Sequence, residues 1–303
     1  MSQSIHRYIR SLTRHYPSRF LAPQFSRLME HLFPTREPLW LVSEPCGQAP
    51  FWALNLAHSH QRKIYYFPKA WGAYWMAESF PSFLDKHVVP GSLFMDIGAH
   101  LGSFSFYAAR LIGPEGQSIL FEPDPDIYEA LARSAKLNYP DTIICENIAL
   151  SNENGTATFY KARRPASSSL MPESEAEGHA QRYESSVEVA RLRLDDYVEE
   201  HEVDLDRLKL IKCDVEGHEI ETVSGMRQTL VDAGYPLLWQ EVRGPSGSTR
   251  APNTYPEVKR LLGELGYKPF FWTDGALRPV LDKEVVGRED VVFRHEDGNK
   301  EGG

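Results

Sequence analysis

The feature that most constrains the fold is a change of pattern near residue 91 of the 303-residue chain. From there on, short apolar runs alternate with stretches at helical spacing, which is typical of β-α-β units around a mostly parallel sheet. The run "SLFMDIGA" predicts the first strand, and apolar residues from Leu101 to Ile112 then recur at helical spacing until Gly113 and Pro114 end the helix. The sequence therefore predicts an α/β fold with a glycine turn between this strand and this helix.

Further strands follow at regular intervals. The run "QSILFEPDP" predicts the second strand, and Asp124 before Pro125 has the form of a helix N-cap with proline at the first helical position, so we expect a cap rather than a ligand. "TIICENIAL", "RLKLIKCDVEG" and "YPLLWQEV" predict strands three to five, and "TATFYKA" is expected to pair with "SVEVARLRL". One helix after strand four is expected to carry Ile220, Val223, Leu230 and Val231, and "YKPFFWTDG" and "EDVVFR" are candidate final strands.

Three regions are predicted along the chain. Residues 1–85 form an N-terminal helical and hairpin cap region, in which "FWALNLAHSHQRKIYYF" is expected to make two strands around a polar turn. Residues 86–295 form the main α/β domain, and residues 296–303 a disordered tail. Trp71 and Trp75 lie one helical turn apart, so they either stack on a ligand or pack between the two regions. The polar stretch from Arg163 to Glu184 is long enough for a functional loop.

Charge and composition limit the partners and the location. The net charge of −9 argues against binding to nucleic acid. Three widely spaced cysteines fit a reducing compartment, and no apolar run has the length of a transmembrane segment. We therefore expect a cytoplasmic protein. A homo-oligomer is left open as an alternative to a monomer. The basic N-terminus is expected to be a helix packed on the main domain, with contact to an anionic membrane as the alternative.

The glycine turn points to a particular kind of ligand. Gly98 and Gly102 are expected to let a ligand approach the backbone, and the following helix directs its N-terminal amides toward a carboxylate or phosphate. Glu122 closes the second strand twenty positions after Gly102, where an acidic side chain binds the two hydroxyls of a ribose. Because the dinucleotide pattern G-x-G-x-x-G is not met, S-adenosylmethionine fits better than NAD.

Five blocks resemble the FkbM family of S-adenosylmethionine-dependent methyltransferases. They are "FMDIGAHLGSFSFYAARLIGPEG", "ILFEPDP", "NIALSNENGTATFY", "RLDDYV" and "LIKCDVEGHEIETVSGM", and the similarity runs from Ile64 to Val242. The resemblance implies a class I methyltransferase sheet of seven strands, the last one antiparallel, with S-adenosyl-L-methionine as the cofactor. It also implies methyl transfer to a small-molecule acceptor, a hydroxyl of a sugar or of a secondary metabolite.

The resemblance also assigns the residues that bind the methyl donor. The loop with Asp96, Gly98, Ala99, His100 and Gly102 is expected around the methionine moiety, and Glu122 on the ribose. Asn147 and Ala149 are expected to lie against the adenine, with Phe121 as a packing partner. Many relatives have Asn at the position of His100 and a small residue at that of His218.

The third motif, "CDVEGHE", offers the catalytic candidates Asp214, Glu216 and His218. If the segment stays extended, these three side chains point to the same side, toward the donor methyl group. Holding oxygen, carbon and sulfur in line supplies most of the rate, and a base that takes the hydroxyl proton contributes second. We rank His218 together with Asp214, because the reference pKa of histidine suits a base near neutral pH. Glu219 is expected to cap the next helix or to be solvated.

Several alternatives stay open. The preferred interpretation includes no metal, but Asp214, Glu216 and His218 are also a candidate set of ligands for a divalent cation. Lys212 is expected to pair with Asp214 at the surface and to stabilise little, and the role of Glu241 is left open. Amino-group methylation is disfavoured because the D/N-P-P-aromatic motif is absent. A donor-binding protein without catalytic activity is the remaining alternative.

Overall fold

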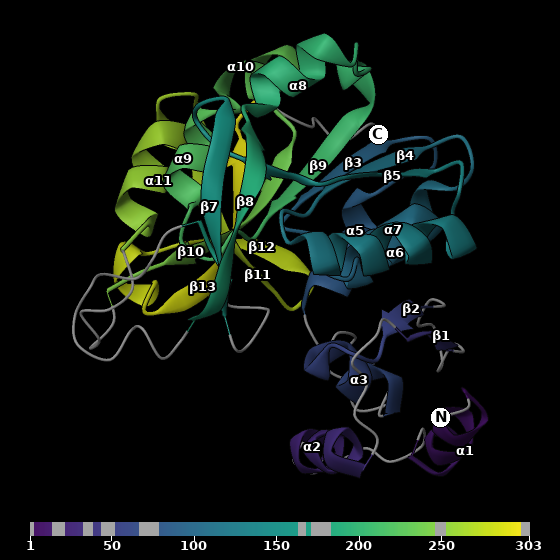
Figure 1. Cartoon of the computed structure of the whole chain (residues 1–303). Helices are drawn as coiled ribbons and strands as arrows, with labels where there is room; N and C mark the ends of the chain where they lie inside the picture. Colours follow the sequence, from purple (N-terminus) through teal and green to yellow (C-terminus); the bar gives the residue numbers. More distant parts are fainter. Residues whose placement is uncertain are drawn as a thin grey trace.

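The computed structural model describes residues 3–13, 22–32, 39–43, 52–66, 79–162, 168–170, 183–245 and 253–297. Its centre is a sheet of eight described strands in the order β12-β11-β13-β10-β9-β3-β4-β5 (Figure 1). The strands are β3 (Leu93–Ile97), β4 (Gln117–Phe121), β5 (Ile143–Glu146), β9 (Leu208–Cys213), β10 (Leu237–Arg243), β11 (Tyr267–Thr273), β12 (Ala276–Pro279) and β13 (Arg288–His295).

The sheet has the strand directions that the resemblance implies. Strands β5, β4, β3, β9 and β10 pair in parallel, and β13 lies antiparallel between β10 and β11. The chain order reverses between β3 and β9, which is the switch point where open α/β sheets bind ligands. Seven strands with the last one antiparallel are therefore confirmed, and β12 adds an eighth, which the prediction did not include, by pairing with β11 in a hairpin. The prediction of "TIICENIAL" as one strand was wrong, since the segment divides into β5 and β6 (Ile148–Leu150), which belong to different sheets.

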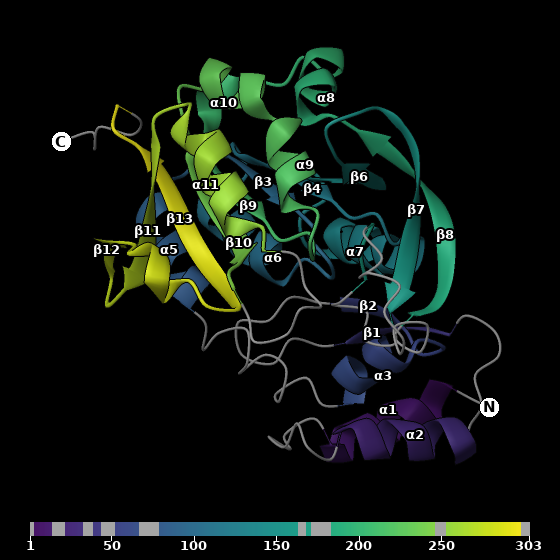
Figure 2. The same cartoon turned by 90° about the vertical axis from the view of Figure 1, so that its left-hand side faces the viewer.

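Helices cover both faces of the sheet (Figures 1 and 2). All five residues of β3 are buried, as expected of a strand with helices on either side. One face carries α5 (Ser79–His87), α6 (Ser103–Ile112) and α7 (Pro125–Asn138), and the other carries α8 (Leu194–Glu200), α9 (Glu219–Ser224), α10 (Arg227–Asp232) and α11 (Tyr255–Gly263). Short 3-10 turns, η3 (Leu205–Arg207) and η4 (Asp282–Glu284), complete the connections.

The single helix predicted after strand four is two helices, α9 and α10. The chain breaks the helix at Gly225, where a Cβ atom would lie 1.8 Å from the carbonyl oxygen of Ser151. This close backbone contact displaces the second half of the helix. Leu230 and Val231 are adjacent in α10 and point about 100° apart around its axis, so Leu230 is buried while Val231 stays 37% exposed and does not share the buried face as predicted.

A separate three-stranded sheet stands beside the main one (Figure 2). It has the order β6-β8-β7, with β6 (Ile148–Leu150), β7 (Gly155–Ala162) and β8 (Tyr183–Leu192). The predicted pairing of "TATFYKA" with "SVEVARLRL" is confirmed as β7 and β8. Most of the polar stretch from Arg163 to Glu184 lies outside the described residues, but Ser169 exchanges two backbone hydrogen bonds with Tyr160 at 2.9 and 3.2 Å.

The N-terminal region departs from one prediction. The described elements are α1 (Gln3–Thr13), α2 (Ala22–Leu32), β1 (Trp40–Ser43), β2 (Trp52–Asn55) and α3 (Ser59–Tyr66). The prediction of a second strand within residues 51–67 was wrong, since that segment is α3 and the partner of β2 is β1. The aromatic run that favoured a strand is instead buried against α1 and α2, where His6 contacts Tyr66 and Arg62 contacts Ser26.

This region packs on the main domain. The Ala53 amide of β2 donates to the Ser134 hydroxyl of α7 at 2.9 Å. Helix α5, which crosses the predicted boundary at residue 85, accepts a hydrogen bond from the Trp272 indole at the Ser82 hydroxyl, 2.8 Å away. The boundaries at residues 85 and 295 stay predictions. The predicted pair Trp71 and Trp75, and the tail from residue 298, lie outside the described residues.

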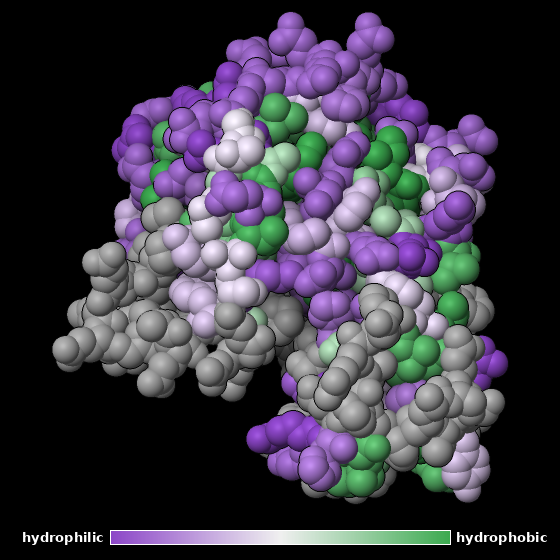
Figure 3. Space-filling model, viewed as in Figure 1, coloured by the Kyte–Doolittle hydropathy of each residue, from purple (hydrophilic) through white to green (hydrophobic). Residues whose placement is uncertain are grey.

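The surface shows the usual mixture of residue types. Hydrophilic residues predominate over α8 and α10, and hydrophobic residues are interspersed below them (Figure 3). Among the described helices, none has the length and hydrophobicity needed to cross a membrane.

Candidate active site

The loop after β3 is folded onto the end of β4. The amides of Gly98 and Ala99 both donate to the carbonyl oxygen of Phe121 at 3.0 Å. Positive φ angles at Gly98 (79°), His100 (52°) and Gly102 (76°) produce the tight turn, and α6 begins directly after Gly102. The amides at the start of α6 therefore lie at the switch point of the sheet.

The two glycines serve the packing of the protein itself. A Cβ atom on Gly98 would lie 1.9 Å from the carbonyl oxygen of Asp214, and one on Gly102 would lie 2.6 Å from Leu131. We expected both glycines to leave room for a ligand. The structure corrects this explanation, because the space beside each glycine is occupied by protein atoms. Gly98 is needed so that the ends of β3 and β9 can approach each other.

Glu122 is held in place by two backbone amides. Its Oε2 accepts from the His100 amide at 2.8 Å, and its Oε1 accepts from the Asp124 amide at 2.9 Å. Burial raises the pKa of Glu122 to about 8, the charges of Asp124 and Asp96 act in the same direction, and the two amides act against them. The carboxylate is thus oriented beside the glycine loop, where the sequence predicts the ribose of the donor.

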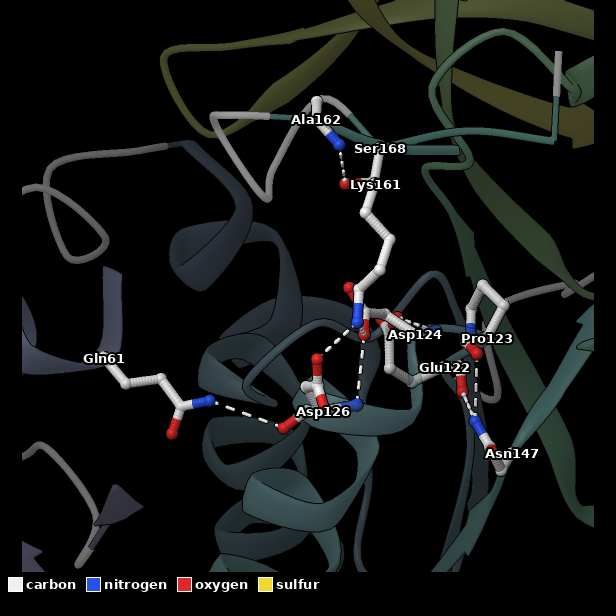
Figure 4. Close-up of polar contacts among 9 residues, drawn as sticks. All are labelled: Gln61, Glu122, Pro123, Asp124, Asp126, Asn147, Lys161, Ala162 and Ser168. Carbon is white, nitrogen blue, oxygen red and sulfur yellow. Dashed lines mark hydrogen bonds and ion pairs between the residues drawn. The ribbon is translucent and has the colours of Figure 1, made fainter. Parts of the chain in front are cut away.

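The side chains predicted near the adenine have partners within the protein. Asn147 donates from Nδ2 to the carbonyl oxygens of Glu122 and Pro123 at 2.8 and 3.0 Å (Figure 4). The Phe121 ring is fully buried and packs edge-on against Tyr197 at 4.9 Å between centroids. Ala149 belongs to the small core of the three-stranded sheet. These residues frame the loop that follows β4.

His100 adopts a left-handed backbone conformation, in which Asn, Asp and His are the enriched non-glycine residues. Desolvation lowers the pKa of its imidazole to about 4. Its side chain is therefore neutral at physiological pH, and its backbone amide is the group that contacts Glu122.

Asp96 and Lys212 form a buried pair across adjacent strands. Lys212 Nζ lies 3.1 Å from Asp96 Oδ1, and the side chains are 6% and 1% exposed. The Ser105 hydroxyl donates to the second oxygen of Asp96. Burial alone would lower the pKa of Lys212, but Asp96 and Asp214 raise it above its ordinary value. Lys212 also pairs with Asp214 as predicted, at 3.9 Å, but the pair does not lie at the surface as expected, because the Lys212 side chain is only 6% exposed.

The segment after β9 turns instead of staying extended. Glu216 and Gly217 have φ angles of 56° and 110°, so the prediction that Asp214, Glu216 and His218 all point to one side was wrong. Oxygens of Asp214, Glu216 and Glu241 lie within 4.8 Å of one another. Arg243 contacts Glu216 Oε2 at 2.7 Å and compensates part of this negative charge.

His218 is directed away from these carboxylates. Its Nε2 lies 2.9 Å from the Ser151 hydroxyl, and its Nδ1 lies 3.5 Å from Glu221 Oε2. Burial lowers the pKa of His218. The residue thus connects the N-terminus of α9 to the end of β6, which is a structural contact.

The candidate set of metal ligands changes accordingly. Asp214 and Glu216 are close together as predicted, but Glu241 stands where His218 was expected. Sequence reasoning left Glu241 open and missed Arg243. The available signal was the strand order, since both residues lie near the carboxyl end of β10, which pairs with β9 in parallel. Carboxylate oxygens are the ligands that Mg²⁺ and Ca²⁺ take, and they also accept hydrogen bonds from hydroxyl groups.

The strand order, the glycine loop at the switch point and the acidic residue that ends β4 define a class I methyltransferase. Residues 96–269, more than half of the chain, match the family model described as Methyltransferase FkbM domain. The chain belongs to the FkbM methyltransferase family, and it is a methyltransferase that uses S-adenosyl-L-methionine.

Three relatives are similar to this chain. Methyltransferase sdnD of Sordaria araneosa is 30% identical over 57% of this chain and 72% of that protein. Hexuronic acid methyltransferase AglP of Haloferax volcanii is 26% identical over 47% of this chain and 53% of its own length. 2-O-methyltransferase NoeI of Sinorhizobium fredii is 30% identical over 49% of this chain and 62% of its own length. The chain thus covers less than two thirds of the last two proteins.

Proposed function

We propose that this enzyme transfers the methyl group of S-adenosylmethionine to a hydroxyl group of a sugar or of a sugar-like secondary metabolite. The observation that carries the proposal is the group of carboxylates formed by Asp214, Glu216 and Glu241 beside the donor loop. The Asp214 amide donates to the Ile97 carbonyl at 3.0 Å, so this group directly adjoins the loop. The names of two relatives, a hexuronic acid methyltransferase and a 2-O-methyltransferase, support a sugar acceptor.

On the donor side, Glu122 binds the ribose hydroxyls through the lone pairs that the two amides leave available. The loop from Asp96 to Gly102, with Ala99 and His100, holds the methionine moiety together with the start of α6. Asn147, Phe121 and Ala149 shape the adenine end by fixing the segment after β4. The N-terminal amides of α6 favour the carboxylate of the donor.

On the acceptor side, Asp214 is the proposed base. The acceptor oxygen attacks the methyl carbon, the carbon–sulfur bond breaks with its electron pair going to sulfur, and the hydroxyl proton passes to Asp214. S-adenosylhomocysteine and the methyl ether are the products. We assign this role to Asp214 because its side chain is 36% exposed, whereas Glu216 pairs with Arg243 and His218 with Ser151. Alignment of the reacting atoms supplies the larger share of the rate.

The test measures binding and transfer separately. Calorimetry with S-adenosylhomocysteine reports the donor site, and a panel of sugars and amines with methyl-labelled donor reports the acceptor. We expect Asp214→Asn to lower kcat by about 10²–10⁴-fold, the contribution of a positioned base, with little change in product affinity. Asp206→Asn, at an exposed site, is the control and should behave like the wild type. Labelled amines without labelled sugars would contradict O-methylation.

A further inference from the structure

The loop from Glu122 to Asp126 is held by side chains from three other parts of the chain (Figure 4). Asn147, after β5, donates to the carbonyl oxygens of Glu122 and Pro123. Gln61 of α3 donates to the Asp126 carbonyl at 3.4 Å. Lys161, near the end of β7, contacts the side chains of Asp124 and Asp126. Asn147 and Gln61 are neutral, so the contact of Lys161 is the one among these three that is made by a charged side chain.

The Lys161 ammonium meets a carboxylate that is itself buried. Its Nζ lies 2.9 Å from Asp124 Oδ1, and the side chains are 20% and 7% exposed. Asp124 also caps α7, because its Oδ1 accepts from the Asp126 amide at 3.0 Å. These carboxylates raise the pKa of Lys161 against the lowering effect of burial. Asp124 Oδ1 is therefore the acceptor both in the N-cap hydrogen bond and in the ion pair with Lys161.

A short chain of contacts leads from this ion pair to the donor-binding carboxylate. The Asp124 backbone amide donates to Glu122 Oε1 at 2.9 Å. Without the ammonium group, the buried carboxylate of Asp124 would lie uncompensated near Glu122, whose ionised form it disfavours. Lys161 compensates this charge and fixes the residue whose amide orients Glu122.

Lys161 is itself presented from a well-connected strand end. The next residue, Ala162, donates its amide to the Ser168 hydroxyl at 2.9 Å (Figure 4). Tyr160 pairs with Ser169 through two backbone hydrogen bonds. The anchor for the loop after β4 thus comes from the three-stranded sheet, outside the main β-α-β framework.

We infer that Lys161 is a positioning residue of the donor site, which acts through Asp124 to keep Glu122 oriented toward the ribose. The inference rests on the proposed role of Glu122. It predicts an effect on donor affinity, since Lys161 acts on the donor loop and has no part in the transfer step.

The test compares Lys161→Met with Lys161→Arg in the full chain. We expect Lys161→Met to raise the Kd of S-adenosylhomocysteine and the KM of S-adenosylmethionine about tenfold, the equivalent of one ordinary charged contact, with kcat at saturating donor within about twofold. Lys161→Arg, which keeps the charge, should recover most of the affinity. Lys259→Met removes a more exposed lysine–aspartate pair, with Asp282 at 2.7 Å, and should leave affinity unchanged.

A double variant separates the inference from the proposed function. In the background of Glu122→Gln, adding Lys161→Met should cause little further loss, because the two residues act on one contact. Additive losses, or wild-type affinity in Lys161→Met, would overturn the inference. If wild-type enzyme binds S-adenosylhomocysteine but methylates only amines, the proposed acceptor fails while the role of Lys161 stands.

Discussion

At the scale of single residues, the proposed contact of Glu122 with the ribose predicts that donor binding depends on pH. Its pKa in the ligand-free enzyme is raised to about 8, mainly by burial. Ribose hydroxyls donate to the ionised carboxylate, so donor binding favours the deprotonated form. Between pH 7 and pH 9 the ionised fraction rises from about one tenth to about nine tenths. We expect the affinity for S-adenosylhomocysteine to increase by up to about tenfold over this range.

Glu122→Gln is the control, because it removes this carboxyl group and leaves the titration of the ligand in place. Calorimetry at pH 7, 8 and 9 should show the increase as a difference between the two proteins, and equal profiles would contradict the prediction.

The free energy of unfolding of the ligand-free enzyme depends on pH in the opposite direction to donor affinity. Since the folded pKa lies above the ordinary value of 4.5, the stability contribution of Glu122 is complete below that pH and is lost as pH rises through about 8.

At the scale of elements, the contact between the ends of β3 and β9 depends on Gly98. A Cβ atom there would meet the Asp214 carbonyl oxygen at 1.9 Å, so Gly98→Ala must separate the donor loop from the proposed base. Gly91 is a matched control, because its φ is also 79° but nothing lies within 4 Å of its Cβ position. We expect Gly98→Ala to destabilise the enzyme by about 1–3 kcal/mol more than Gly91→Ala, the usual cost of overpacking.

Urea unfolding measures this difference, and methyl transfer should fall further in Gly98→Ala than its stability alone explains. Equal free energies of unfolding for the two variants would contradict the predicted importance of this contact. The left-handed conformation costs both variants about the same, roughly 1–2 kcal/mol, so it cancels in the comparison.

At the scale of the whole molecule, the family match begins at residue 96, but the N-terminal elements pack on the matched part. Trp52 and Leu54 of β2 are buried in one core with Leu131 of α7. A chain that begins at residue 79 would expose this face of α7. We expect its melting temperature to fall by roughly 5–10 °C, because each kcal/mol corresponds to about 2–4 °C in a protein of this size. Calorimetry of both chains tests this, and an unchanged melting temperature would contradict it.

Local signals in the sequence determined the α/β framework. Alternating apolar runs predicted the parallel strands, Asp124 before Pro125 predicted the cap of α7, and the paired runs predicted β7 and β8. The same kind of signal placed Glu122 at the end of β4, beside the glycine loop. These features depend on neighbours a few residues apart, which a sequence displays directly.

Only the tertiary structure decided which side chains meet. It turned the chain at Glu216 and Gly217, so that His218 contacts Ser151 while Asp214 joins Glu241. It buried Lys212 against Asp96, and it brought Lys161 from a second sheet to the cap of α7. Such contacts join residues far apart in the chain, and their energies depend on burial and on the other charges nearby. Spacing along a sequence contains neither quantity, which is why the framework was predictable and the partners within the site were not.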